Sequence, residues 1–262
     1  MTFSFLSWLL RACICSTALV IASALDIKCR EIPDELWLAA GPITGALTLF
    51  WLLERPNLAP MAVLSISLAA LIAALIYYSG LTGGADAKAL VFIAISMPLT
   101  QEEFLSTILA EHPFLPMASF SNALVLSVLL SMGILARNLA WRLRTGEPFF
   151  EGLEGSALTK ALVLISGYKV RKEDFLRSSF LFPLEAPSGS GGRRLTLVVR
   201  LDEEREREVR GWLAEFQGPE YVWVSPGLPF VVFLTGGFIL ALVHGDVLFH
   251  AIHRTIKFLL GH

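Results

Sequence analysis

The stretch Thr82-Gly83-Gly84-Ala85-Asp86-Ala87-Lys88 is a short polar break between two strongly apolar runs, Met61–Leu81 and Ala89–Leu99. An acidic side chain beside segments of membrane length is costly to place, so Asp86 is a candidate functional residue. A possible partner, Asp26, follows the first apolar run of the chain. We interpret Asp26 and Asp86 as a catalytic pair that a membrane scaffold brings together.

The composition indicates a polytopic membrane protein. Of the 262 residues, 55% are hydrophobic, whereas ordinary soluble domains are about 45–50% apolar with glycine included. The excess falls in runs of roughly 16–21 residues, close to the length that crosses a bilayer. The chain has no basic tract, which argues against a nucleic-acid partner, and its three cysteines form no C-x-x-C motif for zinc. Because the apolar runs have membrane length, the lipid bilayer is the first expected partner.

The predicted fold is mainly α: six transmembrane helices, with a small α+β cytosolic domain inserted between the fifth and the sixth. The predicted spans are Phe5–Leu25, Leu36–Leu53, Met61–Leu81, Ala87–Leu99, Ala118–Ala136 and Leu228–Val243. Asp26–Glu35 is expected to be a polar loop. The fourth span covers only about 20 Å of a roughly 30 Å hydrocarbon core, so we expect Asp86 to lie below the membrane surface.

Three domains follow from these spans. Residues 1–141 form the membrane domain with both aspartates, 142–220 the cytosolic domain, and 221–262 the sixth span with an amphipathic tail. The cytosolic domain holds more than half of the chain's charged residues. Within it we predict a strand at Leu195–Leu201, another at Tyr221–Ser225, and between them a helix with one apolar face. That face consists of Val209, Trp212, Leu213 and Phe216.

The distribution of lysine and arginine predicts a multi-pass protein of the cell membrane with both aspartates on the cytoplasmic side. One side of the predicted topology carries six basic residues near the spans, and the short loops of the other side carry only Arg55. The six are Lys28, Arg30, Lys88, Arg137, Arg142 and Arg144. Arg11, inside the first span, is expected either to reach the outer surface or to face the bundle interior.

Two carboxylates can hydrolyse a peptide bond without a metal, a cofactor or a covalent intermediate. One is ionised and takes a proton from water, and the other is protonated and donates a hydrogen bond to the scissile carbonyl. Two like charges a few ångströms apart do not ionise together cheaply, which produces this asymmetry. Gly83 and Gly84, which lack a Cβ, allow backbone to lie close to an extended substrate.

The chain resembles the type IV prepilin peptidases, membrane aspartic proteases of the G-x-G-D class. The resemblance rests on Asp26-Ile27-Lys28-Cys29-Arg30-Glu31-Ile32-Pro33-Asp34 and on Gly83-Gly84-Ala85-Asp86-Ala87-Lys88. A third segment, Val222–Phe230, is similar to the entry to the last span in archaeal preflagellin and prepilin peptidases. At the third motif position the chain has Ala85 where the G-x-G-D pattern has glycine.

This resemblance implies catalysis by Asp26 and Asp86, with Gly83, Gly84, Ala85 and Lys88 shaping the loop or contacting substrate. The implied substrate is a preprotein with a short basic leader before an apolar helix, cut at the cytoplasmic face and later assembled into a type IV pilus or an archaellum. Bacterial members often add an N-terminal cysteine quartet and N-methylate the new terminus. That quartet is absent from this chain, so peptidase activity alone is expected.

Three other interpretations remain open. A presenilin-type protease pairs Tyr-Asp with a later Gly-x-Gly-Asp, whereas Leu25 precedes Asp26 here. A transporter with the two aspartates as an ion or proton site is the alternative from another class, and such folds show paired internal repeats that this sequence lacks. A metal site is the third, because four histidines lie near the C-terminus: His244, His250, His253 and His262. The predicted topology puts them on the side opposite the aspartates.

Overall fold

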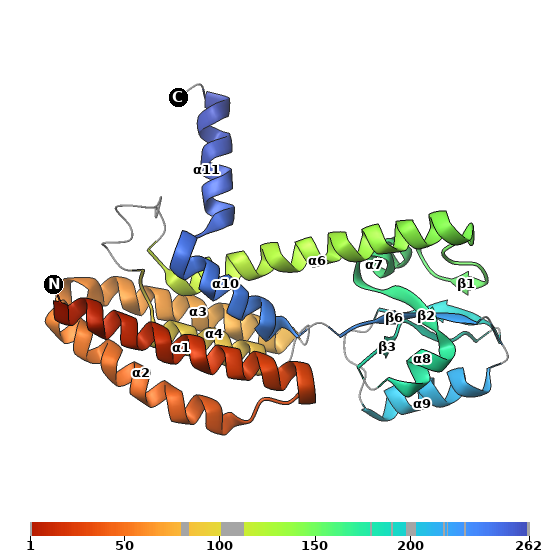
Figure 1. The fold of residues 1–262 in the computed structure, drawn as a ribbon, viewed down its shortest axis with the longest axis horizontal. Coiled ribbons are helices and arrows are strands. Elements are labelled where there is room, and N and C mark those ends of the chain that lie inside the picture. The colour runs from red at the N-terminus through yellow and green to blue at the C-terminus, as the bar shows by residue number, and fades with distance from the viewer. Residues whose placement is uncertain are drawn as a thin grey trace. The chain divides into compact units, whose positions relative to one another are not determined.

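The structure, a computed structural model, describes residues 2–79, 84–100, 113–178, 180–189, 191–197, 203–216, 218, 220–227 and 229–260 (Figure 1). The chain divides into two compact units. The first, called the membrane unit, comprises Met1–Ser127 and Pro229–His262, and the second, called the soluble unit, comprises Val128–Leu228.

The membrane unit is built of helices. In chain order they are α1 (Thr2–Cys29), α2 (Asp34–Glu54), the 3-10 turn η1 (Pro56–Leu58), α3 (Ala59–Ser79), α4 (Gly84–Ser96), the first part of α6 (Leu115–Thr145), α10 (Phe230–His244) and α11 (Val247–Leu260). Among the described residues, four stretches can cross a membrane by length and composition: Phe5–Cys29, Asp34–Glu54, Pro56–Tyr78 and Leu115–Thr145. The pair α10 and α11, bent by 54°, makes a fifth if it is one span. These apolar helices confirm an integral membrane protein of mainly helical fold.

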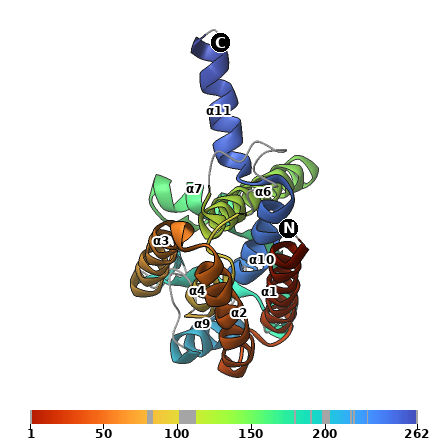
Figure 2. The same cartoon turned by 90° about the vertical axis from the view of Figure 1, so that its left-hand side faces the viewer.

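Helix α4 lies at the centre of the membrane unit. It contacts α1, α2, α3 and α10, and in Figure 2 it lies between α3 on one side and α1, α2 and α10 on the other. A helix that is apolar around its whole circumference is buried, and eight of its 13 residues are buried here. They are Asp86, Ala87, Ala89, Leu90, Phe92, Ile93, Ala94 and Ser96. Surrounding helices therefore cover a segment that is itself shorter than a bilayer is thick.

Two predicted boundaries near the aspartates are wrong. Helix α1 continues to Cys29, so Asp26 lies in its last turn and not in a loop. Residues 26–29 contain neither glycine nor proline, so the helix continues through them, and it ends only where Arg30 takes left-handed backbone. Helix α4 begins at Gly84, so Asp86 lies in its first turn, because the alanines at 85 and 87 are strong helix formers.

Helix α6 is also longer than predicted. It runs from Leu115 to Thr145, past the predicted end at Ala136, because its continuation is rich in leucine, alanine and arginine. It ends at Gly146, which has a φ of 71° and donates its N–H to the carbonyl of Arg142 at 2.9 Å. A glycine with left-handed backbone is the usual residue just past a helix end.

Close backbone contact joins α6 to α10 within the membrane unit. A Cβ placed on Gly237 would meet the carbonyl oxygen of Ser119 and lie 2.7 Å from the nitrogen of Ala123. Beside this contact the buried Asn122 donates to the carbonyl of Gly245 and accepts from the N–H of Val247, both at 2.9 Å. These bonds satisfy backbone groups that the break between α10 and α11 leaves unpaired.

The soluble unit is a small α+β fold, as predicted. Two three-stranded sheets have the orders β1-β5-β4 and β2-β6-β3. The strands are β1 (Leu153–Glu154), β2 (Tyr168–Arg171), β3 (Phe182–Pro183), β4 (Glu185–Pro187), β5 (Arg193–Leu195) and β6 (Tyr221–Ser225), and the helices are α7 (Ala157–Ser166), α8 (Lys172–Arg177) and α9 (Glu203–Glu215). The central strand β6 is antiparallel to both β2 and β3.

The sequence predicted β6 and α9 better than β5. Strand β6 has the predicted bounds, and α9 buries Val209 and Leu213 with Trp212 packed beside them. Of the described part of the predicted strand Leu195–Leu201, only Leu195 lies in β5, and the prediction is wrong for Thr196 and Leu197. Residues 198–202 lie outside the described part of the chain.

Candidate active site

Asp86 is placed by the first turn of the central helix α4, and only 7% of its surface is exposed. The preceding residue, Ala85, packs against the main apolar cluster of the membrane unit. A Cβ on Gly84 would make only ordinary contact with the ring of Tyr77, 3.4 Å away, so space does not require glycine there. Gly83 lies outside the described residues.

Asp26 lies in the last turn of α1, partly exposed. The helix ends at Cys29, and the next residue, Arg30, has a φ of 59° and donates its N–H to the carbonyl of Asp26 at 3.2 Å. Left-handed backbone is uncommon for a residue with a side chain. It cannot continue a right-handed helix, so the chain turns at Arg30. One turn before Asp26, the fully buried Ala22 belongs to the same apolar cluster as Ala87 of α4.

An ion pair ties α4 to the start of α2. Lys88 Nζ lies 2.5 Å from Asp34 Oδ1, and 49% and 62% of the two side chains is exposed. Only residues 30–33 separate α1 from α2. The last turn of α1 is joined to the first turn of α2 through the chain, and the first turn of α4 is joined to it through the ion pair. Asp26 and Asp86 therefore lie at the same end of the membrane unit.

The opposite end of α4 is held by a buried polar network. Ser96, its last residue, accepts a hydrogen bond on its carbonyl from Thr48 at 2.7 Å and donates from its hydroxyl to Thr44 at 2.7 Å. Arg11, 2% exposed, donates to Thr48 at 3.3 Å and lies 4.8 Å from the ring of Trp51. The guanidinium thus faces the bundle interior, one of its two predicted positions. A cation near a helix C-terminus complements the helix dipole.

No metal centre is found in the described ranges. Within them, no group of three or more His, Cys, Asp and Glu residues could hold a metal ion. His250 and His253 both lie on α11. The expectation of a peptidase without metal or cofactor stays a prediction.

The comparisons with known proteins concern both units. Residues 13–136, which include both aspartates, match the type IV leader peptidase family. Residues 159–247 match the family described as Archaeal Peptidase A24 C-terminus Type II. The chain belongs to the type IV leader peptidase family. It is also similar to a preflagellin peptidase from Methanococcus voltae, with 23% identity over 241 residues that cover 87% of this chain and 92% of that protein.

Family membership confirms the resemblance seen in the sequence, including its archaeal character. The segments that carried it now lie in definite places: the Asp26 motif at the junction of α1 and α2, and the Asp86 motif at the start of α4. Sequence reasoning missed the pairing of Lys88 with Asp34 and the polar network at Ser96. Both join residues far apart in the chain, and serines and threonines inside apolar runs give no local signal of a partner.

Proposed function

We propose that this leader peptidase is a membrane aspartic endopeptidase that removes the short basic leader of prepilin- or preflagellin-type subunits at the cytoplasmic face. The observation that carries the proposal is that Asp26, in the last turn of α1, and Asp86, in the first turn of α4, lie at the same end of the membrane unit, within the segment that matches the family. The substrate class comes from the family name and from the similarity to a preflagellin peptidase.

In this mechanism the two carboxylates share one proton. The ionised aspartate takes a proton from the attacking water, and the protonated one donates to the carbonyl oxygen of the scissile peptide. The tetrahedral intermediate then collapses as the leaving amine receives a proton. Because the pair titrates jointly, neither aspartate is assigned as the base.

We expect substrate binding to bring the carboxylates together. Holding two carboxylates about 3 Å apart without a shared ligand destabilises the resting protein, and sites that assemble around a substrate avoid this. Since Asp86 lies in a helix, closure requires movement of the first turn of α4, and not of a loop alone. The Ser96 network keeps the other end of α4 in place, and the exposed Lys88–Asp34 pair is weak enough to rearrange.

The proposed membrane organisation has six spans, with α4 and α10 as the two that are shorter than a bilayer requires, and a cytosolic domain at about 142–220. The basic residues near the aspartates support a cytoplasmic active site. Single cysteines at Ser188 and Asn57, in a chain whose own cysteines are replaced by serine, test this. A membrane-impermeant maleimide added to intact cells is expected to label Asn57→Cys and spare Ser188→Cys. The reverse pattern would place both aspartates outside.

The catalytic test uses Asp26→Asn and Asp86→Asn in a membrane-based processing assay, with Glu54→Gln as the matched control. Glu54 is an exposed acid at the far end of α2. General acid–base catalysis contributes about 10²–10⁴-fold, so each asparagine variant should lose at least a hundredfold in rate while it remains inserted. Full cleavage by either variant would end the two-aspartate mechanism.

A further inference from the structure

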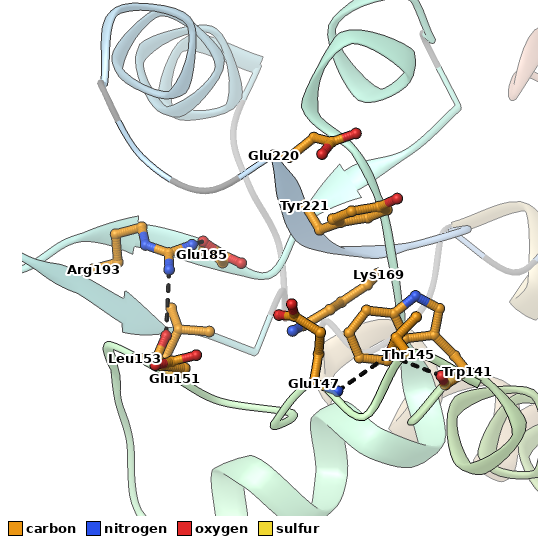
Figure 3. A pocket seen from close by; sticks show the side chains of 10 residues that line it. All are labelled: Trp141, Thr145, Glu147, Glu151, Leu153, Lys169, Glu185, Arg193, Glu220 and Tyr221. Carbon is orange, nitrogen blue, oxygen red and sulfur yellow. Dashed lines mark hydrogen bonds and ion pairs between the residues drawn. The ribbon is translucent and has the colours of Figure 1, made fainter. Parts of the chain in front are cut away.

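The soluble unit contains a cavity of about 640 Å³ to which the proposed peptidase chemistry assigns no role (Figure 3). Residues from the end of α6, from the segment between α6 and β1, and from both sheets line it. Its volume is within the range of about 300–1,000 Å³ typical of ligand pockets. The cavity is therefore large enough for one long side chain and the peptide backbone that carries it.

The lining carries an excess of negative charge. It includes four glutamates and two basic residues: Glu147, Glu151, Glu185, Glu220, Lys169 and Arg193. Two of the glutamates are neutralised, because Glu185 pairs with Arg193 at 2.7 Å and Glu220 pairs with Arg171 at 3.2 Å. Within the part of the chain that the structure describes, the carboxylates of Glu147 and Glu151 accept no hydrogen bond and form no ion pair.

One wall of the cavity already holds an ammonium group. Lys169 Nζ lies 4.4 Å from the ring centroid of Trp141 and donates to the carbonyl of Pro148 at 3.1 Å. Tyr221 packs edge-on against the same indole, with ring centroids 6.0 Å apart. Burial lowers the pKa of Lys169, while the negative charge of Glu147 and other nearby glutamates raises it. Aromatic faces beside carboxylates are the surroundings that stabilise a cationic side chain.

We propose that this cavity binds a lysine or arginine side chain of a peptide, held by the carboxylates of Glu147 and Glu151 and by the rings of Trp141 and Tyr221. The peptide is the basic leader of the substrate, an assignment that rests on the proposed function. Each carboxylate can accept from an ammonium or a guanidinium group, and the latter binds carboxylates in a bidentate manner. An anionic ligand would meet these two carboxylates and is less favoured at this site than a cationic one.

Binding is tested on the full-length protein in detergent, with Asp86→Asn in every sample so that nothing is cleaved. The probe is acetyl-Lys-Lys-Lys-Gly-amide, and acetyl-Ser-Ser-Ser-Gly-amide is the uncharged comparison. The double variant Glu147→Gln/Glu151→Gln removes the two carboxylates. Its matched control, Glu208→Gln/Glu215→Gln, removes two exposed charges from α9 that do not line the cavity.

Calorimetric titration should show the lysine peptide binding more tightly than the serine peptide, with affinity lost in the cavity variant and kept in the control. Exposed ion pairs are worth up to about fivefold each, so loss of both should weaken binding by up to about 25-fold. Equal loss in the two variants would show a non-specific charge effect and overturn the proposal. Equal binding of the two peptides would overturn it as well.

The source of the peptide is tested with the active chain and a preprotein substrate. If the leader occupies the cavity, Glu147→Gln/Glu151→Gln raises KM by a similar factor and leaves kcat unchanged, and replacing the leader lysines with serine abolishes the difference. If the variant loses the lysine peptide but keeps its KM, the leader is not the ligand, and that assignment is wrong. The binding titration needs no catalysis. It therefore tests the cavity even if the two-aspartate mechanism is wrong.

Discussion

Removal of the Glu185 carboxylate is predicted to destabilise the soluble unit severely. This side chain is fully buried. Its Oε2 accepts from Arg193 Nη1, and its Oε1 accepts from the backbone N–H of Trp223 in β6, both at 2.7 Å. The substitution Glu185→Ala therefore leaves a buried guanidinium without its counter-charge and a buried N–H without its acceptor.

The magnitude follows from those two losses. Removing one partner of a buried ion pair costs about 3–5 kcal/mol, and an unsatisfied buried donor adds about 1–3 kcal/mol. Because the two effects share one side chain, we expect a loss of about 4–6 kcal/mol, a large part of the roughly 5–15 kcal/mol that stabilises a typical domain. At about 2 kcal/mol per molar urea, the middle of the usual range for small proteins, the unfolding midpoint should fall by roughly 2–3 M.

Pulse proteolysis of the full-length protein in detergent, over a urea series, measures this shift. The control is Glu185→Gln/Arg193→Met, which removes both charges and keeps an oxygen that can accept from Trp223. Replacing both members of a buried pair is often close to neutral, so this variant should lose far less than Glu185→Ala. If Glu185→Ala shifts the midpoint by less than the double variant does, the buried pair does not hold β4, β5 and β6 together.

Three further predictions concern other contacts. Lys88→Glu should reduce processing by about two- to fivefold, the scale of an exposed ion pair, and adding Asp34→Lys should restore it; no rescue in the processing assay would mean that the pair does not position α4. Burial raises the pKa of Glu185, so its contribution to stability is largest below the pKa of the unfolded chain and is lost as pH rises through the folded value. The stability of the native chain relative to Glu185→Gln should thus fall as pH rises above the ordinary glutamate pKa of about 4.3, and a flat difference in urea midpoints would contradict this. Gly237→Ala should cost about 1–3 kcal/mol by overpacking against Ser119, whereas Gly41→Ala, with open space around it, should not lower the melting temperature in detergent.

Hydropathy located the long helices because a bilayer requires about 20 apolar residues in a row. It could not show that α4 is covered by four helices, since a segment that is apolar all round has no periodicity to indicate its neighbours. Strand β5 begins two residues earlier than the predicted strand at Leu195–Leu201, and a different reason explains this start. Pattern reading places a charged residue outside, but Arg193 lies inside because Glu185 neutralises it.

For the site, the sequence was informative where an ionisable side chain lies next to a segment of membrane length, because that placement is costly. Asp26 and Asp86 are acids beside apolar runs, and such residues draw attention on energetic grounds alone. The Lys88–Asp34 pair spans 54 positions, and no local rule pairs residues so far apart. The Thr48–Ser96 bond is equally hidden, because these small hydroxyl residues lie within predicted spans and count there as neutral.

The burial of α4 sets an order of events during synthesis. Its neighbour α10 begins at Phe230, more than 130 residues after α4 ends at Ser96. At about 5–20 residues per second, the ribosome needs roughly 7–26 seconds to make the intervening chain. Throughout that time α4 lacks α10, one of the four helices that pack against it. A helix of about 20 Å does not span a bilayer by itself. The helix that carries Asp86 thus reaches its final surroundings only after the entire soluble unit has been translated. Until then, the membrane unit of the nascent chain is incomplete around Asp86.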